Sequence, residues 1–306
     1  ESNMGEFSKR VGDVGEDIVV DILSLMGWKD VARNIQLPCC TKSHEKQTHG
    51  IDSLYLYTSP LESNSVENVV ISSKYSSHPY KAVPSTFKDH FKDIANTIEC
   101  YSKSSVKSEY NKSFWRSMRK NDIGVLFYFN NDTSPENQEI ISQISNLRID
   151  KDIKYKLIHV IDNKRASFLF NALTYMKRVY HDKVEFYYPS TSLNISSPDK
   201  KYRSSIMPVE FITAPIIPIV IDVSGNDEQL ALCLLTNENI TEESLELLIS
   251  CAREISQDLT KNIILIFPHY NILNHKELIE RAKISLLSDG VRLNIDVKSF
   301  NTSYSG

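Results

Sequence analysis

The stretch GIDSLYLYTSPLESNSVENVVISSKY, residues 50–75, decides the fold of this chain. Apolar and β-branched residues dominate Gly50–Tyr57 and again Asn68–Tyr75, which predicts two strands. The segment Pro60–Glu67 between them is rich in turn residues. The two strands are therefore expected to form a hairpin.

The segment before the hairpin, Gly5–Trp28, is predicted to be a helix that ends near Gly27. Its apolar residues recur at spacings of three and four, as in Phe7, Val11, Val14, Ile18 and Ile22. Gly12 and Gly15 each cost roughly 1 kcal/mol relative to Ala inside a helix. We expect them to mark a break in the helix or the close approach of another segment.

Strands and helices alternate through the rest of the chain, which predicts an α/β sheet covered on both faces. Further strands are predicted near residues 123–129, 156–161, 184–188, 218–223, 230–235, 263–267 and 291–297, and helices near residues 87–101, 166–180, 242–259 and 276–287. The Ser-, Pro- and Asn-rich segment Pro189–Met207 is typical of a long connection. We place a domain boundary near residue 200, giving domains 1–200 and 201–306. The second is either a small α/β domain or an extension of the first sheet.

The composition is that of an ordinary globular protein, with 41% hydrophobic and 24% charged residues. It has no run of about 18 apolar residues and no apolar signal segment, so no membrane association is expected. The five cysteines are too few and too scattered for a disulfide framework, which favours the cytoplasm.

The charges are unevenly distributed, although the net charge is only −4. Ten basic and four acidic residues lie between Ser72 and Lys120, whereas seven basic and fourteen acidic residues follow from Glu210 onward. A phosphate backbone needs only a local basic surface, because its affinity arises from counterion release at the contact. The segment that follows the hairpin is therefore the candidate for nucleic-acid contacts.

Three residues provide the chemistry that phosphodiester hydrolysis requires. A divalent cation held by hard oxygen ligands activates water and stabilises charge on the phosphate, and a nearby lysine orients that water or offsets the charge. Asp52 begins the first hairpin strand, Lys74 lies near the end of the second, and Glu16 lies on the preceding helix. Each alone has an ordinary structural explanation, as a turn cap, an edge lysine or a helix-dipole acid.

The ordered set of these residues resembles the PD-(D/E)xK, or restriction-endonuclease-like, nuclease superfamily. The resemblance covers roughly residues 5–80 and rests on the run Gly12-x-x-Gly15-Glu16, Leu23, Gly27-Trp28, Arg33-Asn34, Gly50-Ile51-Asp52 and a strand that ends in x-x-Lys74. It implies a mixed sheet flanked by helices, with the C-terminal α/β region added to it. It also implies that Glu16, Asp52 and the backbone carbonyl of Ser73 bind Mg²⁺ or Mn²⁺, and that Lys74 is the catalytic lysine.

Ser72 departs from the pattern, because it stands where the family has Asp or Glu. A hydroxyl is a weaker ligand for a hard dication than a carboxylate. Either Glu16 compensates for the missing acid, or the site has lost catalysis and is kept as a surface that binds DNA or a partner protein.

The basic residues closest in sequence to Lys74 are the candidates for phosphate contacts, together with two from the segment Tyr101–Lys120. They are Lys81, Lys88, Lys92, Lys112 and Arg116. The segment Tyr101–Lys120 interleaves aromatic and basic residues, which suits base stacking beside phosphate contacts. It equally suits an amphipathic helix with buried aromatics and solvated lysines.

Other types of site find less support in the sequence. His49 lies beside Gly50 and has two interpretations, a residue near the phosphate or metal and an ordinary loop residue. Cys39, Cys40, His44 and His49 are close in sequence, but their spacing matches no standard zinc site. There is no nucleotide-binding P-loop, dinucleotide fingerprint or nucleophile elbow.

The sequence thus predicts a cytoplasmic, Mg²⁺- or Mn²⁺-dependent DNA endonuclease with a role in restriction or anti-phage defence. An RNA nuclease would share the site and differ only in substrate. The C-terminal region is expected to form a homo-oligomer or to bind a protein partner in a defence complex.

Overall fold

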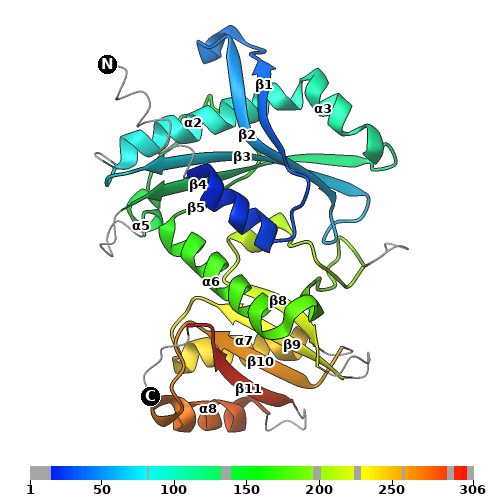
Figure 1. The fold of residues 1–306 in the computed structure, drawn as a ribbon, viewed down its shortest axis with the longest axis vertical. Helices are drawn as coiled ribbons and strands as arrows, with labels where there is room; N and C mark the ends of the chain where they lie inside the picture. Colours follow the sequence, from blue (N-terminus) through cyan, green and yellow to red (C-terminus); the bar gives the residue numbers. More distant parts are fainter. Residues whose placement is uncertain are drawn as a thin grey trace. The chain divides into compact units, whose positions relative to one another are not determined.

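The fold was obtained as a computed structural model (Figure 1). It describes residues 15–80, 83–131, 139–195, 201–223, 229–256, 259–287 and 293–301. The chain divides into two compact units between Ser167 and Phe168. The division falls before the expected boundary near residue 200, because the strand β6 that follows it belongs to the second sheet.

The first unit contains a five-stranded mixed sheet with the strand order β1-β2-β3-β4-β5. Its strands are β1 (Ala32–Pro38), β2 (Thr48–Thr58), β3 (Ser65–Ser76), β4 (Arg119–Asn130) and β5 (Ile158–Ile161). The pairs β1–β2 and β2–β3 are antiparallel, whereas β3–β4 and β4–β5 are parallel. The predicted hairpin is thus β2–β3, in which Ser53 faces Ile71.

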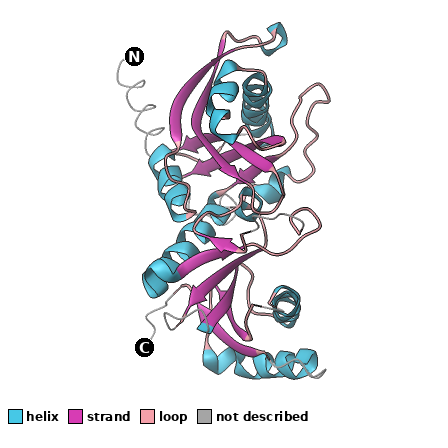
Figure 2. Cartoon of the chain, turned by 90° about the vertical axis from the view of Figure 1, so that its right-hand side faces the viewer, coloured by secondary structure: helices cyan, strands magenta, loops and turns pink. Residues whose placement is uncertain are grey.

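Helices cover both faces of this sheet, as the alternation of elements predicted (Figures 1 and 2). Helix α2 (Val83–Ser102) packs its buried residues Phe91, Ile94 and Ile98 against Val70 and Leu126 of the sheet. Side chains on a strand alternate between its faces. Even-numbered residues of β3 therefore face α2, and odd-numbered ones face away.

A helix that includes residues 15–25 lies against the odd-numbered side of β3. A Cβ added to Gly15 would come within 2.5 Å of the Cβ of Tyr75 and 3.5 Å of the Oγ of Ser73. The expected close approach of another segment is confirmed at Gly15, whereas Gly12 lies outside the described residues. The helix ends as predicted, since Gly27 has the positive φ of 77° that glycine accommodates best.

The described residues of the first unit also form short helices, and one long helix continues from it into the second unit. They are α3 (Ser105–Tyr110), η2 (Lys112–Phe114) and α5 (Ile141–Ile144), followed by α6 (Asn163–Tyr180). A single helical turn, η1 (Lys42–His44), lies in the loop between β1 and β2.

The second unit has its own six-stranded sheet, with the order β11-β10-β9-β8-β6-β7. The strands are β6 (Val184–Tyr187), β7 (Arg203–Ser204), β8 (Ile216–Asp222), β9 (Leu230–Thr236), β10 (Asn262–Phe267) and β11 (Asn294–Ser299), and the helices are η3 (His181–Lys183), η4 (Val209–Ile212), α7 (Glu242–Ile255) and α8 (Ile272–Leu287). Strands β9, β10 and β11 are parallel and share an apolar core with α7. The C-terminal region is therefore not an extension of the first sheet.

Among the residues described, no helix has the length and apolar content required to cross a membrane.

Candidate nuclease site

Asp52 is held in place by the neighbouring strand of the hairpin. Its Oδ2 accepts a hydrogen bond from the Ser73 backbone N–H at 2.7 Å and another from the Ser72 hydroxyl at 3.2 Å. Both bonds reach the same oxygen, so Oδ1 makes no hydrogen bond among the described residues. Ser72, which stands where the pattern has an acid, therefore helps to orient Asp52, which matches the pattern.

Lys74 lies two residues beyond Ser72 and shares its face of β3, as period-two alternation requires. Its Nζ is 3.6 Å from Oδ2 of Asp93, which lies on α2. Asp93 also pairs with Lys46 from the loop before β2. The hairpin provides Asp52 and Lys74, and α2 adds Asp93 beside Lys74. Asp93 is not part of the sequence pattern.

The charges around Asp93 keep it ionised. Burial alone would raise its pKa, but the hydrogen bond from Lys46 and the charges of Lys74, Lys46 and His49 outweigh burial, and the net pKa is lowered. Lys74 and Asp93 are each about a third exposed or less, with 26% and 33% of their side chains accessible. A partly exposed pair of this kind is weak and can be exchanged for a phosphate group.

Aromatic residues lie beside Lys74 on the same face of the sheet. Lys74 is paired in register with Tyr128 of β4, and the rings of Tyr80 and Tyr128 stack at a centroid distance of 4.1 Å. The Tyr128 hydroxyl is buried and makes no hydrogen bond among the described residues. His90 of α2 completes this aromatic group, with its ring 5.7 Å from that of Tyr128.

The pKa of His90 is lowered, first by burial and then by the charge of Lys74. Asp93 and Asp89 oppose this shift without cancelling it. His90 is therefore neutral near neutral pH, and its imidazole can donate one hydrogen bond and accept another next to Lys74.

Glu16 lies near this end of the sheet because the preceding residue, Gly15, packs against β3. Gly15 lies directly against Tyr75 and Ser73, on either side of Lys74 in sequence, and Glu16 follows it on the same helix. The absence of a side chain at Gly15 is what allows the helix to approach so closely. Asp52 and Lys74 thus share the face of the sheet that α2 covers, whereas the helix that carries Glu16 lies against the opposite face near the end of β3.

Comparison with known protein families gives a match over residues 4–165 to the GAPS4 protein PD-(D/E)XK nuclease domain. The match covers a little more than half of the chain. The chain belongs to this family. The resemblance to the PD-(D/E)xK superfamily is confirmed, and so is the expected mixed sheet flanked by helices. No curated protein and no solved structure matches the chain.

The basic residues proposed to contact phosphate lie at two different ends of the GAPS4 nuclease domain. Lys88 and Lys92 lie on α2 on either side of His90, close to Lys74. Lys112 and Arg116 precede β4, whose first residue, Arg119, pairs with Ser65 at the start of β3. Ser65 and Lys74 are nine residues apart along one strand, or about 30 Å. Lys81 lies outside the described residues.

The segment Tyr101–Lys120 contains a buried aromatic residue and also an exposed aromatic residue beside a basic one. Tyr101 is fully buried, and its hydroxyl donates to Asn68 at 3.1 Å, so this aromatic belongs to the core. Trp115 is 72% exposed and carries the Arg116 guanidinium over its ring at 5.0 Å. Tyr101 is thus a core residue, whereas Trp115 and Arg116 lie at the surface.

Asp93 and His90 are the site residues that sequence reasoning missed. They lie three apart on α2, directly beside the apolar stripe formed by Phe87, Phe91 and Ile94. A polar stripe that borders an apolar one at helical spacing was the available signal. It indicates residues at the edge of the buried face, where a side chain can reach over the sheet.

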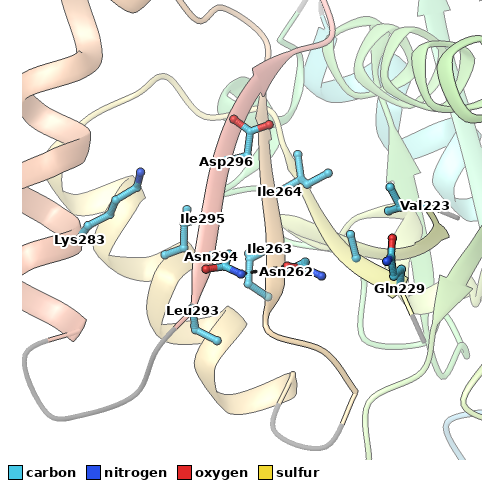
Figure 3. Close-up of a pocket in the computed structure, with 11 residues that line it drawn as sticks. Val223, Gln229, Asn262, Ile263, Ile264, Lys283, Leu293, Asn294, Ile295 and Asp296 are labelled. Atoms are coloured by element: carbon cyan, nitrogen blue, oxygen red, sulfur yellow. Dashed lines mark hydrogen bonds between the residues drawn. The ribbon is translucent and has the colours of Figure 1, made fainter. Parts of the chain in front are cut away.

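The second unit of this GAPS4 chain contains an open pocket lined by residues of β9, β10, β11 and α8 (Figure 3). Asn262 and Asn294, the first residues of β10 and β11, are joined across it by a hydrogen bond of 3.2 Å. The pocket is therefore at the amino ends of parallel strands. Ligands of open α/β sheets bind at the carboxyl ends, so this pocket is not the site that the fold favours.

Proposed function

We propose that this chain is a divalent-metal-dependent DNA endonuclease that acts in anti-phage defence. The observation that carries the proposal is the convergence of Asp52 and Lys74 on one face of the β2–β3 hairpin, with Asp52 oriented by Ser72 and Ser73. Membership of a nuclease-domain family supports the same reaction class.

The donor atoms at this site suit a hard dication. Oδ1 of Asp52 makes no hydrogen bond among the described residues, and the Ser72 hydroxyl oxygen lies 3.2 Å from Oδ2. Mg²⁺ keeps several waters and binds through one or two carboxylates together with substrate phosphate. Asp52 and the carbonyl of Ser73 would hold the ion, and Glu16 would reach it around the end of β3 from the helix on the opposite face of the sheet. A missing acid at Ser72 is compatible with such binding.

A divalent cation in this position would lower the pKa of a water molecule and stabilise charge on the scissile phosphate. Lys74 exchanges its exposed pair with Asp93 for the phosphate and offsets the charge that develops there. Asp93 keeps Lys46 as a partner after that exchange, so no unpaired charge is left behind. Lys88 and Lys92 supply nearby positive charge for the DNA backbone.

The test is cleavage of supercoiled plasmid, single-stranded DNA and RNA with added Mg²⁺, added Mn²⁺ or no added cation. Asp52→Asn keeps an acceptor for the Ser73 N–H and removes the charge, and Lys74→Gln keeps most of the side-chain volume. We expect each variant to lose cleavage on the order of 100-fold or more. The matched controls are Asp89→Asn, an exposed acid of α2, and Lys276→Gln, an exposed lysine of α8 in the second unit.

Cleavage that requires an added cation and persists only in the two controls would support the proposal. Cleavage that survives in both site variants would refute the assignment of Asp52 and Lys74. Cleavage of RNA alone would keep the site and change the substrate.

A second candidate function is a non-catalytic subunit that binds DNA or a partner protein, and Ser72 is the observation that favours it. The hydroxyl of Ser72 neutralises no charge and satisfies Asp52 through a simple hydrogen bond. This candidate predicts no cleavage with either cation and DNA binding that is unchanged by Lys74→Gln.

A further inference from the structure

Two cysteines and two histidines from separate elements meet at one point of the first unit. Cys39 follows β1, His44 ends η1, His49 lies in β2, and Cys100 lies near the end of α2. One ligand atom from each lies within 4.8 Å of every other. We propose that these four side chains bind a structural zinc ion.

Four of the six distances among the ligand atoms match a tetrahedron around zinc, and the other two are within 4.8 Å. Bonds of about 2.3 Å to sulfur and about 2.0 Å to nitrogen place two sulfurs about 3.8 Å apart, a sulfur and a nitrogen about 3.5 Å apart, and two nitrogens about 3.3 Å apart. The two sulfurs, of Cys39 and Cys100, lie 3.9 Å apart. His44 Nδ1 lies 3.5 Å from each sulfur and 3.3 Å from His49 Nε2.

A network of hydrogen bonds does not account for this arrangement. One imidazole nitrogen carries either one hydrogen or one lone pair, so His44 Nδ1 can pair with only one of its three close neighbours. A cation at the centre is attracted to all four ligand atoms at once. His49 and Cys100 are almost fully buried, at 3% and 1% exposure, so water does not take the place of the missing partners.

The surroundings of the four residues also suit a metal site. The other ring nitrogen of His44, Nε2, lies 3.4 Å from Oε2 of Glu99, and a carboxylate in this position orients a metal-bound histidine. The backbone N–H of Cys40 donates to the sulfur of Cys100 at 3.2 Å, which stabilises a thiolate.

The ligand types select the metal. Two thiolates with two imidazoles are typical of Zn²⁺, whereas Mg²⁺ and Mn²⁺ prefer oxygen ligands. Four protein ligands leave no open position for water or substrate, which is the arrangement of a structural site. This zinc would be distinct from the cation proposed at Asp52, and the inference does not rest on nuclease activity.

The site would fasten the β1–β2 loop and strand β2 to α2. These elements also carry the nuclease site, because Lys46 of the loop and Asp93 of α2 form an ion pair, and Asp93 pairs with Lys74. His49 precedes Asp52 by only three residues on β2. A zinc ion there would fix α2 over the hairpin and so set the position of Asp93.

Cys40 is the obvious competitor, because its sulfur lies 3.1 Å from that of Cys100. It is exposed and is not one of the four residues whose ligand atoms converge. A disulfide between Cys40 and Cys100 is therefore the alternative that the experiment has to distinguish from a zinc site.

The test is the metal content of the full chain, purified without chelator and without a histidine tag, by inductively coupled plasma mass spectrometry. We expect one zinc per chain in the wild type, and its loss in Cys100→Ser and His44→Gln. The control variants Cys40→Ser and Cys251→Ser should keep it, the second lying on α7 in the other unit. Circular dichroism checks that each variant is folded.

A second measurement covers the case in which the ligand variants fail to fold. The wild type is grown with Co²⁺, and a tetrahedral site with two thiolates is expected to show intense ligand-field and sulfur-to-cobalt absorption. Zinc absent from the wild type, zinc retained in Cys100→Ser, zinc lost from Cys40→Ser, or a Cys40–Cys100 disulfide in the non-reduced mass spectrum would each overturn the proposal. Omitting Mg²⁺ leaves the zinc content unchanged, so failure of the nuclease proposal would be seen separately.

Discussion

At the scale of single residues, Ser72 places a neutral hydroxyl next to the Asp52 carboxylate. Its hydroxyl donates to Asp52, whereas a carboxylate there would repel it. We expect Ser72→Asp to lower the melting temperature without added cation, and Mg²⁺ to raise it more than in the wild type, because a dication between two carboxylates relieves the repulsion. The measurement is thermal unfolding with and without Mg²⁺.

The control for this comparison is Ser72→Ala, which removes the hydrogen bond and adds no charge. It should lower stability by about 1 kcal/mol with or without Mg²⁺. Equal effects of Mg²⁺ on the Asp and Ala variants would show that no cation binds next to Asp52.

His159, on β5, links the stability of the first unit to pH. Burial lowers the pKa of its side chain to about 4, against about 6.5 in an unfolded chain. The unfolded state therefore binds more protons between these values, so stability is full above about pH 6.5 and falls as the pH drops towards 4. We expect this one group to account for about 2 kcal/mol of the loss between about pH 7 and about pH 5.

The check is urea unfolding of the wild type and His159→Leu at both pH values. The variant should lose less stability on acidification by about that amount, whatever its stability at neutral pH. A pH dependence that is identical in the two proteins would mean that His159 is protonated equally in the folded and unfolded states.

At the scale of elements, the contact between the first helix and β3 depends on Gly15. A Cβ there would meet the Cβ of Tyr75 at 2.5 Å, and that atom cannot rotate away. Alanine gains about 1 kcal/mol of helix propensity, but overpacking of 1–3 kcal/mol outweighs it. We expect Gly15→Ala to lower the free energy of unfolding by about 1–2 kcal/mol, as measured by denaturant titration.

Gly50→Ala is the matched control, because a Cβ added there meets nothing within 4 Å. This variant should be as stable as the wild type or up to about 1 kcal/mol more stable, since glycine weakens a strand. If Gly15→Ala proves equally harmless, the helix does not lie as close to β3 as the structure places it.

The elements of the first unit were largely predictable, and the exceptions have physical causes. Strands β2 and β3 and helix α2 carry clear apolar patterns, and the structure confirms them. Strand β1 was not predicted, because it is an edge strand that is mostly exposed and includes Asn34 with a positive φ of 53°. Its alternation is limited to Ile35 and Leu37, which pack on the first apolar cluster, so the apolar pattern is too short to predict a strand.

The site was predictable only where its residues lie on neighbouring strands. A hairpin fixes which residues share a face, so the placement of Asp52 and Lys74 on one face could be predicted from the sequence. Asp93 and Cys100 come from α2, and their approach depends on how that helix crosses the sheet. The spacing of Cys39, Cys40, His44 and His49 in the sequence therefore matches no standard zinc site. The fourth proposed ligand, Cys100, is brought to Cys39, His44 and His49 by α2.

At the scale of the whole molecule, the described residues form an apolar cluster in the first unit and another in the second. Leu126 belongs to the first and Leu232 to the second, and both are completely buried. Truncation of a buried leucine to alanine costs about 2–5 kcal/mol. Because each core is formed by residues of its own unit, we expect each substitution to weaken one unit and to leave the other protected.

Hydrogen exchange followed by mass spectrometry tests this expectation, since exchange in core strands reports the free energy of opening each region. Leu232→Ala should speed exchange in peptides from β8, β9 and β10, and leave β2 and β3 as slow as in the wild type. Leu126→Ala should do the reverse, which makes each variant the control for the other. If either substitution speeds exchange equally in both sheets, the two units unfold as one cooperative structure, and the nuclease domain depends on the C-terminal unit for its stability.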